Sequence, residues 1–199
     1  MDKELQEYIK FKENYIFDYK EIIEKEDNLY CDNELLKDEN GYIAESLKWI
    51  NVSYGLHNNY SKLLSNLFPY KFIFKGCLFN SIEGFFQGIK YQDVELQKQV
   101  FQYSGRDALA LKDATPYDWT ISGNIYFLGK TIKRDSKEYD DLVTELYISA
   151  IKNELYRNAI KNCKLPIIHP IGKESKQETT FTRYEFEFML NSLHDFLNK

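Results

Sequence analysis

The sequence predicts a helix-rich α+β single domain with a small sheet, and three observations lead to this prediction. Apolar residues recur at helical spacing in most long segments, whereas only short stretches alternate as strands do. The chain has 199 residues, of which 43% are hydrophobic and 29% are charged, which suits one globular domain with a full core. We find no internal repeat or low-complexity tract that would indicate another architecture.

The first segment is an amphipathic arm. Residues 3–26 carry apolar side chains at helical spacing with Lys and Glu between them, which predicts a helix that lies on the domain as an added arm. The polar stretch from 27 to 41 is the best candidate for a flexible joint, because its acidic residues lack the pattern of a calcium loop. We therefore divide the chain into an N-terminal helical arm with an acidic linker, 1–41, and a domain, 42–199.

The domain is predicted to contain many short elements. In its first half we expect a helix over 44–50, a strand over 70–74, a turn at Lys75-Gly76, a helix after Ser81, a helix over 93–103 with Leu96 inward, and a short helix over 108–111. In its second half we expect a loop over 116–124, a strand over 125–128, a helix capped by Asp135 or Ser136, a helix over 154–162, a short buried strand within 165–172, and a last helix opened by the capping box of Thr182 and Glu185.

The predicted helix that starts after Ser81 carries one polar face. Glu83, Gln87 and Lys90 stack one and two turns apart, and apolar residues fill most of the remaining surface. A carboxylate and an amine in an apolar setting are costly unless they are paired or used. Two interpretations remain open, a structural Glu–Lys pair in a core helix and a working site. The glycines at 84 and 88 would let another backbone or a flat ligand approach closely.

Composition excludes several functional classes. The net charge of −5 disfavours nonspecific binding to nucleic acid, but it leaves room for a small phosphorylated ligand held by a few cations. Three scattered cysteines and three scattered histidines indicate neither a disulfide framework nor a metal site, and no cofactor is predicted. The N-terminus resembles no secretory signal and no apolar run is long enough to span a membrane, so we expect a cytoplasmic protein.

Three stretches resemble a known family when they are taken in order. These are Ser65-Asn66-Leu67-Phe68-Pro69, Phe79-Asn80-Ser81-Ile82-Glu83 and Phe86-Gln87-Gly88-Ile89-Lys90-Tyr91. Their order and spacing resemble the NADAR superfamily, also called YbiA-like, whose members carry a Ser-Asn-Phe segment and then a helix with Glu, Gln and Lys at these spacings. The fold class that the resemblance implies is therefore a NADAR/YbiA-like domain.

Later segments extend the resemblance to about residues 52–197. Gly105-Arg106 with Ala108 is similar to the family's Gly/Ala/Arg segment, and Asp118-Trp119 to its following Trp. The stretches 168–173 and 178–182 are similar to a branch of the family with a His-Ser-Ile-Gly stretch and a Thr-rich helix start. The Asp-(x)2-Trp-Gly segment that most members carry is absent, and Pro170 stands where that branch usually has Ser.

The resemblance implies an N-glycosidase of NAD metabolism that acts on an ADP-ribose-type nucleotide or an ADP-ribosylated base. Breaking a C1–N bond builds positive charge on the sugar, so Glu83 would move protons and Lys90 would attack the same carbon. The substrate-binding residues that we predict are Ser65, Asn66, Phe68, Gln87, Arg106, Trp119, Arg134, His169 and Gly172. Each has an ordinary structural alternative, namely turn residues, surface ion pairs, core aromatics or a structural histidine.

Two other hypotheses remain open. The missing Trp-Gly segment favours a binding module that senses or sequesters an NAD-derived nucleotide without turnover. The acidic N-terminal arm could also mediate association with a partner or with a second copy of the chain.

Overall fold

The computed structural model describes residues 2–17, 49–53, 59–111 and 118–199. The chain forms two compact units, each of which is described by itself. Unit 1 comprises Met1–Ser65, Asn158–Gly172 and Arg183–Lys199, and unit 2 comprises Asn66–Arg157 and Lys173–Thr182. Within the described ranges, no helix combines the length and the apolar character that a membrane crossing needs.

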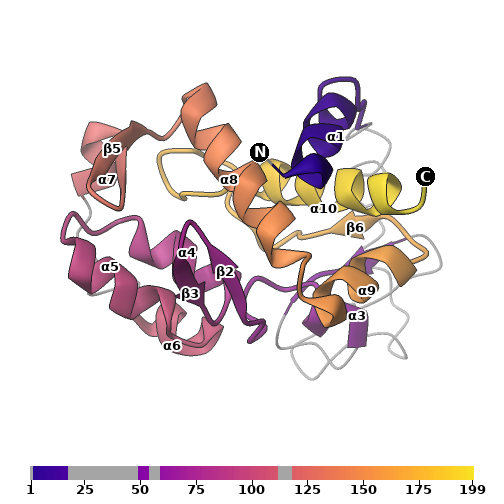
Figure 1. The fold of residues 1–199 in the computed structure, drawn as a ribbon, viewed down its shortest axis with the longest axis horizontal. Coiled ribbons are helices and arrows are strands. Elements are labelled where there is room, and N and C mark those ends of the chain that lie inside the picture. The colour runs from indigo at the N-terminus through magenta and orange to yellow at the C-terminus, as the bar shows by residue number, and fades with distance from the viewer. Residues whose placement is uncertain (1, 18–48, 54–58, 112–117) are drawn as a thin grey trace. The chain divides into compact units, whose positions relative to one another are not determined.

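Unit 1 is built around the C-terminal helix. Its elements are α1 (Lys3–Lys12), β1 (Ile50–Asn51), α3 (Asn59–Leu63), the second half of α9 (Glu154–Asn162), β6 (Ile167–Ile168) and α10 (Arg183–Leu197). Helix α1 lies against α10 (Figure 1). Tyr8 of α1 is fully buried there, and its hydroxyl lies 2.6 Å from the Ser192 hydroxyl of α10. Helix α1 thus packs on the C-terminal helix, and the division into an arm and a domain stays a prediction.

Two predicted helices of unit 1 need correction. The arm helix ends at Lys12 and is followed by a turn, so the prediction of a helix to 26 was too long at least over 13–17, and the rest lies outside the described residues. The helix predicted over 44–50 was wrong at its end, because Ile50 begins β1, which pairs with β6 in a parallel ladder. Residues 44–48 lie outside the described residues.

Unit 2 combines two hairpins with a set of helices. Its elements are β2 (Phe72–Phe74), β3 (Cys77–Phe79), α4 (Ile82–Gly88), α5 (Val94–Phe101), α6 (Gly105–Ala110), α7 (Asp118–Ser122), β4 (Asn124–Phe127), β5 (Lys130–Lys133), α8 (Lys137–Ala150) and the start of α9. Helix α4 packs against α5 and α6, and α8 packs against strands of both hairpins (Figure 1).

Aromatic rings from both hairpins and two helices form the core of unit 2. Phe79 of β3 meets Phe101 of α5 with ring centroids 4.4 Å apart, and Phe74 of β2 meets Phe127 of β4 at 5.6 Å. Phe85 of α4 is fully buried among these rings. The high Phe content of the sequence is therefore used largely for packing.

Small residues allow the helices to approach closely. A Cβ on Gly84 would lie 3.1 Å from the carbonyl oxygens of Val100 and Phe101, and a Cβ on Gly88 would lie 2.4 Å from the Phe101 ring. Gly84 therefore serves the approach of another backbone, that of α5, and Gly88 makes room for the Phe101 ring.

Most predicted elements of unit 2 are confirmed. Helix α8, capped by Ser136, and helix α9 match their predictions. The predicted loop over 116–124 was wrong at α7, and Leu96 is 38% exposed rather than inward because α5 turns Gln97 and Val100 inward instead. The α+β class is confirmed, but the described residues form three two-stranded sheets instead of one small sheet.

Candidate functional site

The first turn of α4 positions the predicted acid. Ser81 caps the helix by accepting the N–H of Gly84 at 3.0 Å. The backbone N–H of Glu83 donates to the carbonyl of Asn66 at 2.9 Å. The Asn66 side chain in turn accepts a hydrogen bond from the Tyr147 hydroxyl at 2.8 Å. Asn66 and Glu83 therefore lie next to each other.

An amide bridges the predicted acid and the predicted nucleophile. Gln87 Nε2 donates to Glu83 Oε1 at 2.7 Å, and Gln87 Oε1 accepts from Lys90 Nζ at 2.8 Å. Lys90 lies beyond the end of α4, but the turn continues because its N–H donates to the Gln87 carbonyl at 3.3 Å. The three side chains thus form one hydrogen-bonded row, hereafter the Glu83–Lys90 row.

Burial shifts both ionisable ends of the row toward their neutral forms. Desolvation raises the pKa of Glu83, although the hydrogen bond from Gln87 and the charge of Lys90 act in the opposite direction. Desolvation likewise lowers the pKa of Lys90, opposed by the charge of Glu83. Both side chains keep some contact with solvent, and Gln87 between them is buried. Titratable groups with such opposed shifts suit acid–base or nucleophilic chemistry.

Trp119 of α7 lies beside the row. The Lys90 ammonium sits 5.7 Å from the centre of the Trp119 ring, within cation–π range. The Trp119 side chain is 3% exposed, and its indole Nε1 has no hydrogen-bond partner among the described residues. A buried N–H without a partner is costly in a folded protein, so this donor is suited to a ligand oxygen or nitrogen.

Three further predicted binding residues also belong to unit 2. Phe68 packs against Tyr70 with ring centroids 4.6 Å apart. Arg106 is exposed on α6, the helix that packs against α4. Arg134 is buried, and its Nε donates to the Thr179 carbonyl at 3.3 Å. Their roles toward a substrate stay predictions.

The remaining predicted residues, Ser65, His169 and Gly172, belong to unit 1. His169 Nδ1 lies 2.6 Å from the Val52 carbonyl, so this nitrogen carries the proton. Burial lowers the pKa of His169. A Cβ on Gly172 would lie 2.8 Å from the His169 ring, which explains the glycine by close packing. Unit 2 therefore brings together only part of the predicted set around Glu83.

Two residues near the site were not among the predicted site residues. Tyr147 lies on the buried face of α8, and its hydroxyl donates to the Asn66 side chain. Phe181 stacks on Phe86 of α4 with centroids 4.8 Å apart. The periodicity of the sequence predicts which face of α8 is buried, but no sequence signal identifies the partner of the Tyr147 hydroxyl.

Comparison with known proteins gives a family for the chain. The family model described as bacteriophage protein GP30.3 matches residues 59–195. The chain is 32% identical over 144 residues to an "Uncharacterized 17.1 kDa protein in Gp30-rIII intergenic region" of Enterobacteria phage T4, covering 67% of this chain and 90% of that protein. No solved structure matches.

These matches overturn the resemblance drawn from the sequence motifs. The assignment to the NADAR superfamily, with its YbiA-like fold name and its keywords, was wrong, because the family model that matches is a different one. The motifs were short polar patterns on a glycine-containing helix, and such patterns can arise wherever a helix packs closely and carries a polar face. What stands from the motifs is the geometry of the Glu83–Lys90 row.

Proposed function

The chain belongs to the bacteriophage protein GP30.3 family, and we propose that its Glu83–Lys90 row cleaves the N-glycosidic bond of an ADP-ribose-type nucleotide or an ADP-ribosylated base. The observation that carries the proposal is the amide bridge between Glu83 and Lys90, whose pKa values burial moves in opposite directions. A proton donor and an amine nucleophile held on one surface are what this bond cleavage requires.

The reaction proceeds through a covalent sugar adduct. Neutral Lys90 Nζ bonds to C1 of the ribose, while the C1–N electron pair leaves with the base and takes a proton from Glu83. The resulting Glu83 carboxylate accepts the proton that the attacking nitrogen loses. The ribose ring opens to an imine as its ring oxygen takes up that proton, and water then releases the sugar aldehyde and restores the amine.

The two pKa shifts support this assignment of roles. A raised pKa keeps a larger fraction of Glu83 protonated near neutral pH, as a proton donor requires. A lowered pKa keeps a larger fraction of Lys90 unprotonated, as a nucleophile requires. Gln87 contacts both heads and holds them in register.

The surroundings of the row support a nucleotide as the substrate. The buried Trp119 N–H offers a donor to a ribose or base atom. The exposed Arg106 guanidinium lies on α6 and is suited to a diphosphate, which pairs well with arginine. We propose the cytoplasm as the compartment, because it holds nucleotides of this class.

The test is release of ADP-ribose from NAD+ and from an ADP-ribosylated guanine oligonucleotide, followed by chromatography. We expect turnover by the natural chain and at least about a hundredfold loss in Glu83→Gln and in Lys90→Ala, as is typical of acid–base and nucleophilic groups. Glu95→Gln and Lys98→Ala are matched controls, because they alter an exposed ion pair on α5.

Borohydride reduction during turnover tests the covalent step. We expect a sugar adduct on Lys90, located by mass spectrometry of peptides, and no adduct in Lys90→Ala. Full turnover with no trapped adduct would remove Lys90 from the nucleophile role. Equal loss of activity in the two α5 controls would refute the assignment of the site.

A second candidate function is binding of such a nucleotide without turnover. It is favoured by the row itself, because Gln87 already engages both Glu83 and Lys90 and could hold them as a fixed polar surface. Calorimetry that shows binding of ADP-ribose with no product over hours would support this candidate. Repeated turnover would exclude it.

A further inference from the structure

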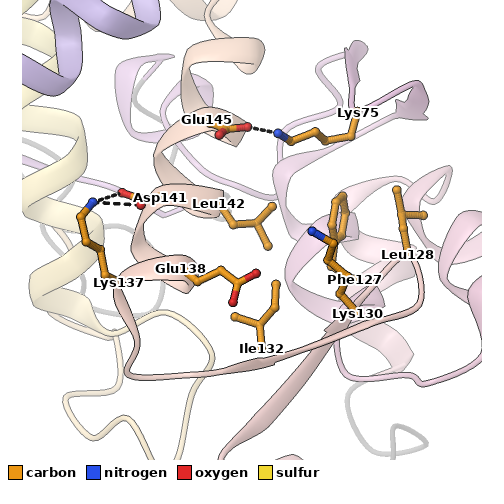
Figure 2. Close-up of a pocket in the computed structure, with 10 residues that line it drawn as sticks. All are labelled: Lys75, Phe127, Leu128, Lys130, Ile132, Lys137, Glu138, Asp141, Leu142 and Glu145. Atoms are coloured by element: carbon orange, nitrogen blue, oxygen red, sulfur yellow. Dashed lines mark hydrogen bonds and ion pairs between the residues drawn. The ribbon is translucent and has the colours of Figure 1, made fainter. Parts of the chain in front are cut away.

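A separate cavity lies in unit 2 between α8 and the tips of the two hairpins. Its volume is about 530 Å³, within the usual range for small-molecule sites. Figure 2 shows the apolar side chains of Phe127, Leu128, Ile132 and Leu142 around it. The cavity thus offers an apolar surface to a ligand, and none of the residues of the Glu83–Lys90 row lines it.

Both hairpins turn on a residue with an unfavourable backbone. Lys75 has φ of 48° and Leu128 has φ of 47°, and each is followed by a glycine with positive φ. This is the pattern of a type I′ turn, whose first position favours Asn, Asp or Gly. Among the described residues, these two are the only non-glycine residues with positive φ, and both line the cavity. Such strained positions cluster at functional sites.

The surrounding structure holds the Leu128 turn in place. The fully buried Gln97 accepts the Leu128 N–H at 2.9 Å through its Oε1. Its Nε2 donates to the carbonyls of Tyr91 and Tyr126. The backbone of the strained leucine is thus held by a buried amide of α5.

Opposite charges border the apolar surface. Helix α8 places Glu138, Asp141 and Glu145 along the cavity, spaced so that they share a face. Lys75 pairs with Glu145, and Lys137 pairs with Asp141 (Figure 2).

One acid and one base of the lining remain available. Among the described residues, neither Glu138 nor Lys130 forms an ion pair or a hydrogen bond through its side chain, and both are exposed. Glu138 points away from α8 into the cavity, next to Ile132 and Leu142 (Figure 2). The cavity therefore has one unused charge of each sign beside an apolar floor.

We propose that this cavity binds a small zwitterionic molecule with an apolar body, of the chemical class of a short apolar peptide with free ends. The ammonium group of the ligand pairs with Glu138, its carboxylate pairs with Lys130, and its apolar body covers Leu128, Ile132 and Leu142. The lining contributes three lysines and three carboxylates, so its formal charge is zero and it selects for a ligand that is itself neutral overall but charged at both ends.

The probe is leucyl-leucine, titrated into the full chain by calorimetry beside three blocked forms. N-acetylation removes its positive charge, C-amidation removes its negative charge, and the doubly blocked form has neither. We expect the free dipeptide to bind most tightly, with about a fivefold loss on blocking either end, as for exposed ion pairs. Equal affinity for all four forms, or no binding of any, would overturn the proposal.

Charge-removing variants assign each end of the ligand. In Glu138→Gln we expect N-acetylation to lose its effect on affinity, and in Lys130→Gln we expect the same for C-amidation. Glu154→Gln and Lys71→Gln, exposed positions outside the cavity lining, are the matched controls. Unchanged discrimination in both cavity variants would overturn the proposed pairing.

A third variant separates binding from folding. Leu128→Asn suits the type I′ turn, so we expect an unchanged or higher Tm together with at least a fivefold loss of leucyl-leucine affinity. Unchanged affinity in this folded variant would overturn the proposal. Light scattering must show the same mass with and without the dipeptide, because a dimer dissociated by the probe would identify the occupant as a second copy of the chain.

Discussion

The Glu83–Lys90 row should cost the protein stability, and a double-mutant cycle can measure that cost. The perturbations are Glu83→Gln, Lys90→Met and the two together. Lys90→Met leaves a desolvated carboxylate with only the hydrogen bond from Gln87, and removing one partner of a buried pair typically costs about 3 to 5 kcal/mol. Because Glu83 keeps some solvent contact and can take up a proton, we expect the lower end, about 3 kcal/mol.

The double variant should behave differently from the sum of its parts. It removes both desolvated charges and keeps a neutral amide for Gln87, so its free energy of unfolding should equal or exceed that of the natural chain. The resulting coupling between the two positions should reach at least about 3 kcal/mol, the upper end of the range for residues in one network. Urea unfolding at pH 7 supplies the four free energies, with Glu95→Gln and Lys98→Met as an exposed control pair.

The pH dependence of unfolding shows independently whether the Glu83 carboxylate stabilises or destabilises the folded chain. Because the pKa of Glu83 is raised in the folded chain, its contribution to stability is complete below the unfolded value of 4.5 and is lost as pH rises through the folded value. Each pH unit inside that window costs about 1.4 kcal/mol, and Glu83→Gln should remove this slope. If the two single variants each lowered the free energy of unfolding by less than about 0.5 kcal/mol and their effects added, a desolvated environment shared by Glu83 and Lys90 would be refuted.

Three other outcomes follow from the packing. Gly105→Ala should lower the free energy of unfolding by about 3 kcal/mol or prevent folding, because the new Cβ would lie 2.2 Å from the Leu67 backbone. Thermal unfolding followed by circular dichroism checks this. A Tm within 2 °C (about 0.5 kcal/mol) of that of the natural chain would contradict it. Gln97→Leu should cost about 3 kcal/mol in urea unfolding, because it leaves backbone groups of the Leu128 turn unpaired; a cost below about 1 kcal/mol would show that they find other partners. Because burial lowers the pKa of His169, the contribution of this residue to stability is complete above pH 6.5 and is lost as pH falls toward the folded value. His169→Gln should therefore make the free energy of unfolding depend less on pH between pH 5 and 7. An unchanged slope would refute this.

The elements of unit 2 that follow a clear period were predictable from the chain. Helix α8 has apolar residues on one face and a serine cap, and both features appeared where they were expected. The cap at Ser81 and the stacking of Glu83 with Gln87 follow from the geometry of any α-helix. Helix α7 was missed because five residues carry too little periodic pattern to distinguish a helix from a loop.

The same limits apply to the family and to the cavity beside α8. Short polar motifs led to assignment to the wrong family. The spacing of polar residues in such motifs follows from helical geometry as well as from common ancestry. The Leu128 turn could not be recognised either, since leucine is a poor residue for a type I′ position.

The sequence alone determined that a carboxylate, an amide and an ammonium would share one side of a polar-faced helix, because their spacing matches the helical repeat. Only the tertiary structure decided that this side of the helix is desolvated and that Trp119 lies beside Lys90. It also decided that two hairpin tips and α8 enclose a cavity. The physical reason is that local spacing follows from backbone geometry, whereas contacts between distant segments depend on how the whole core packs.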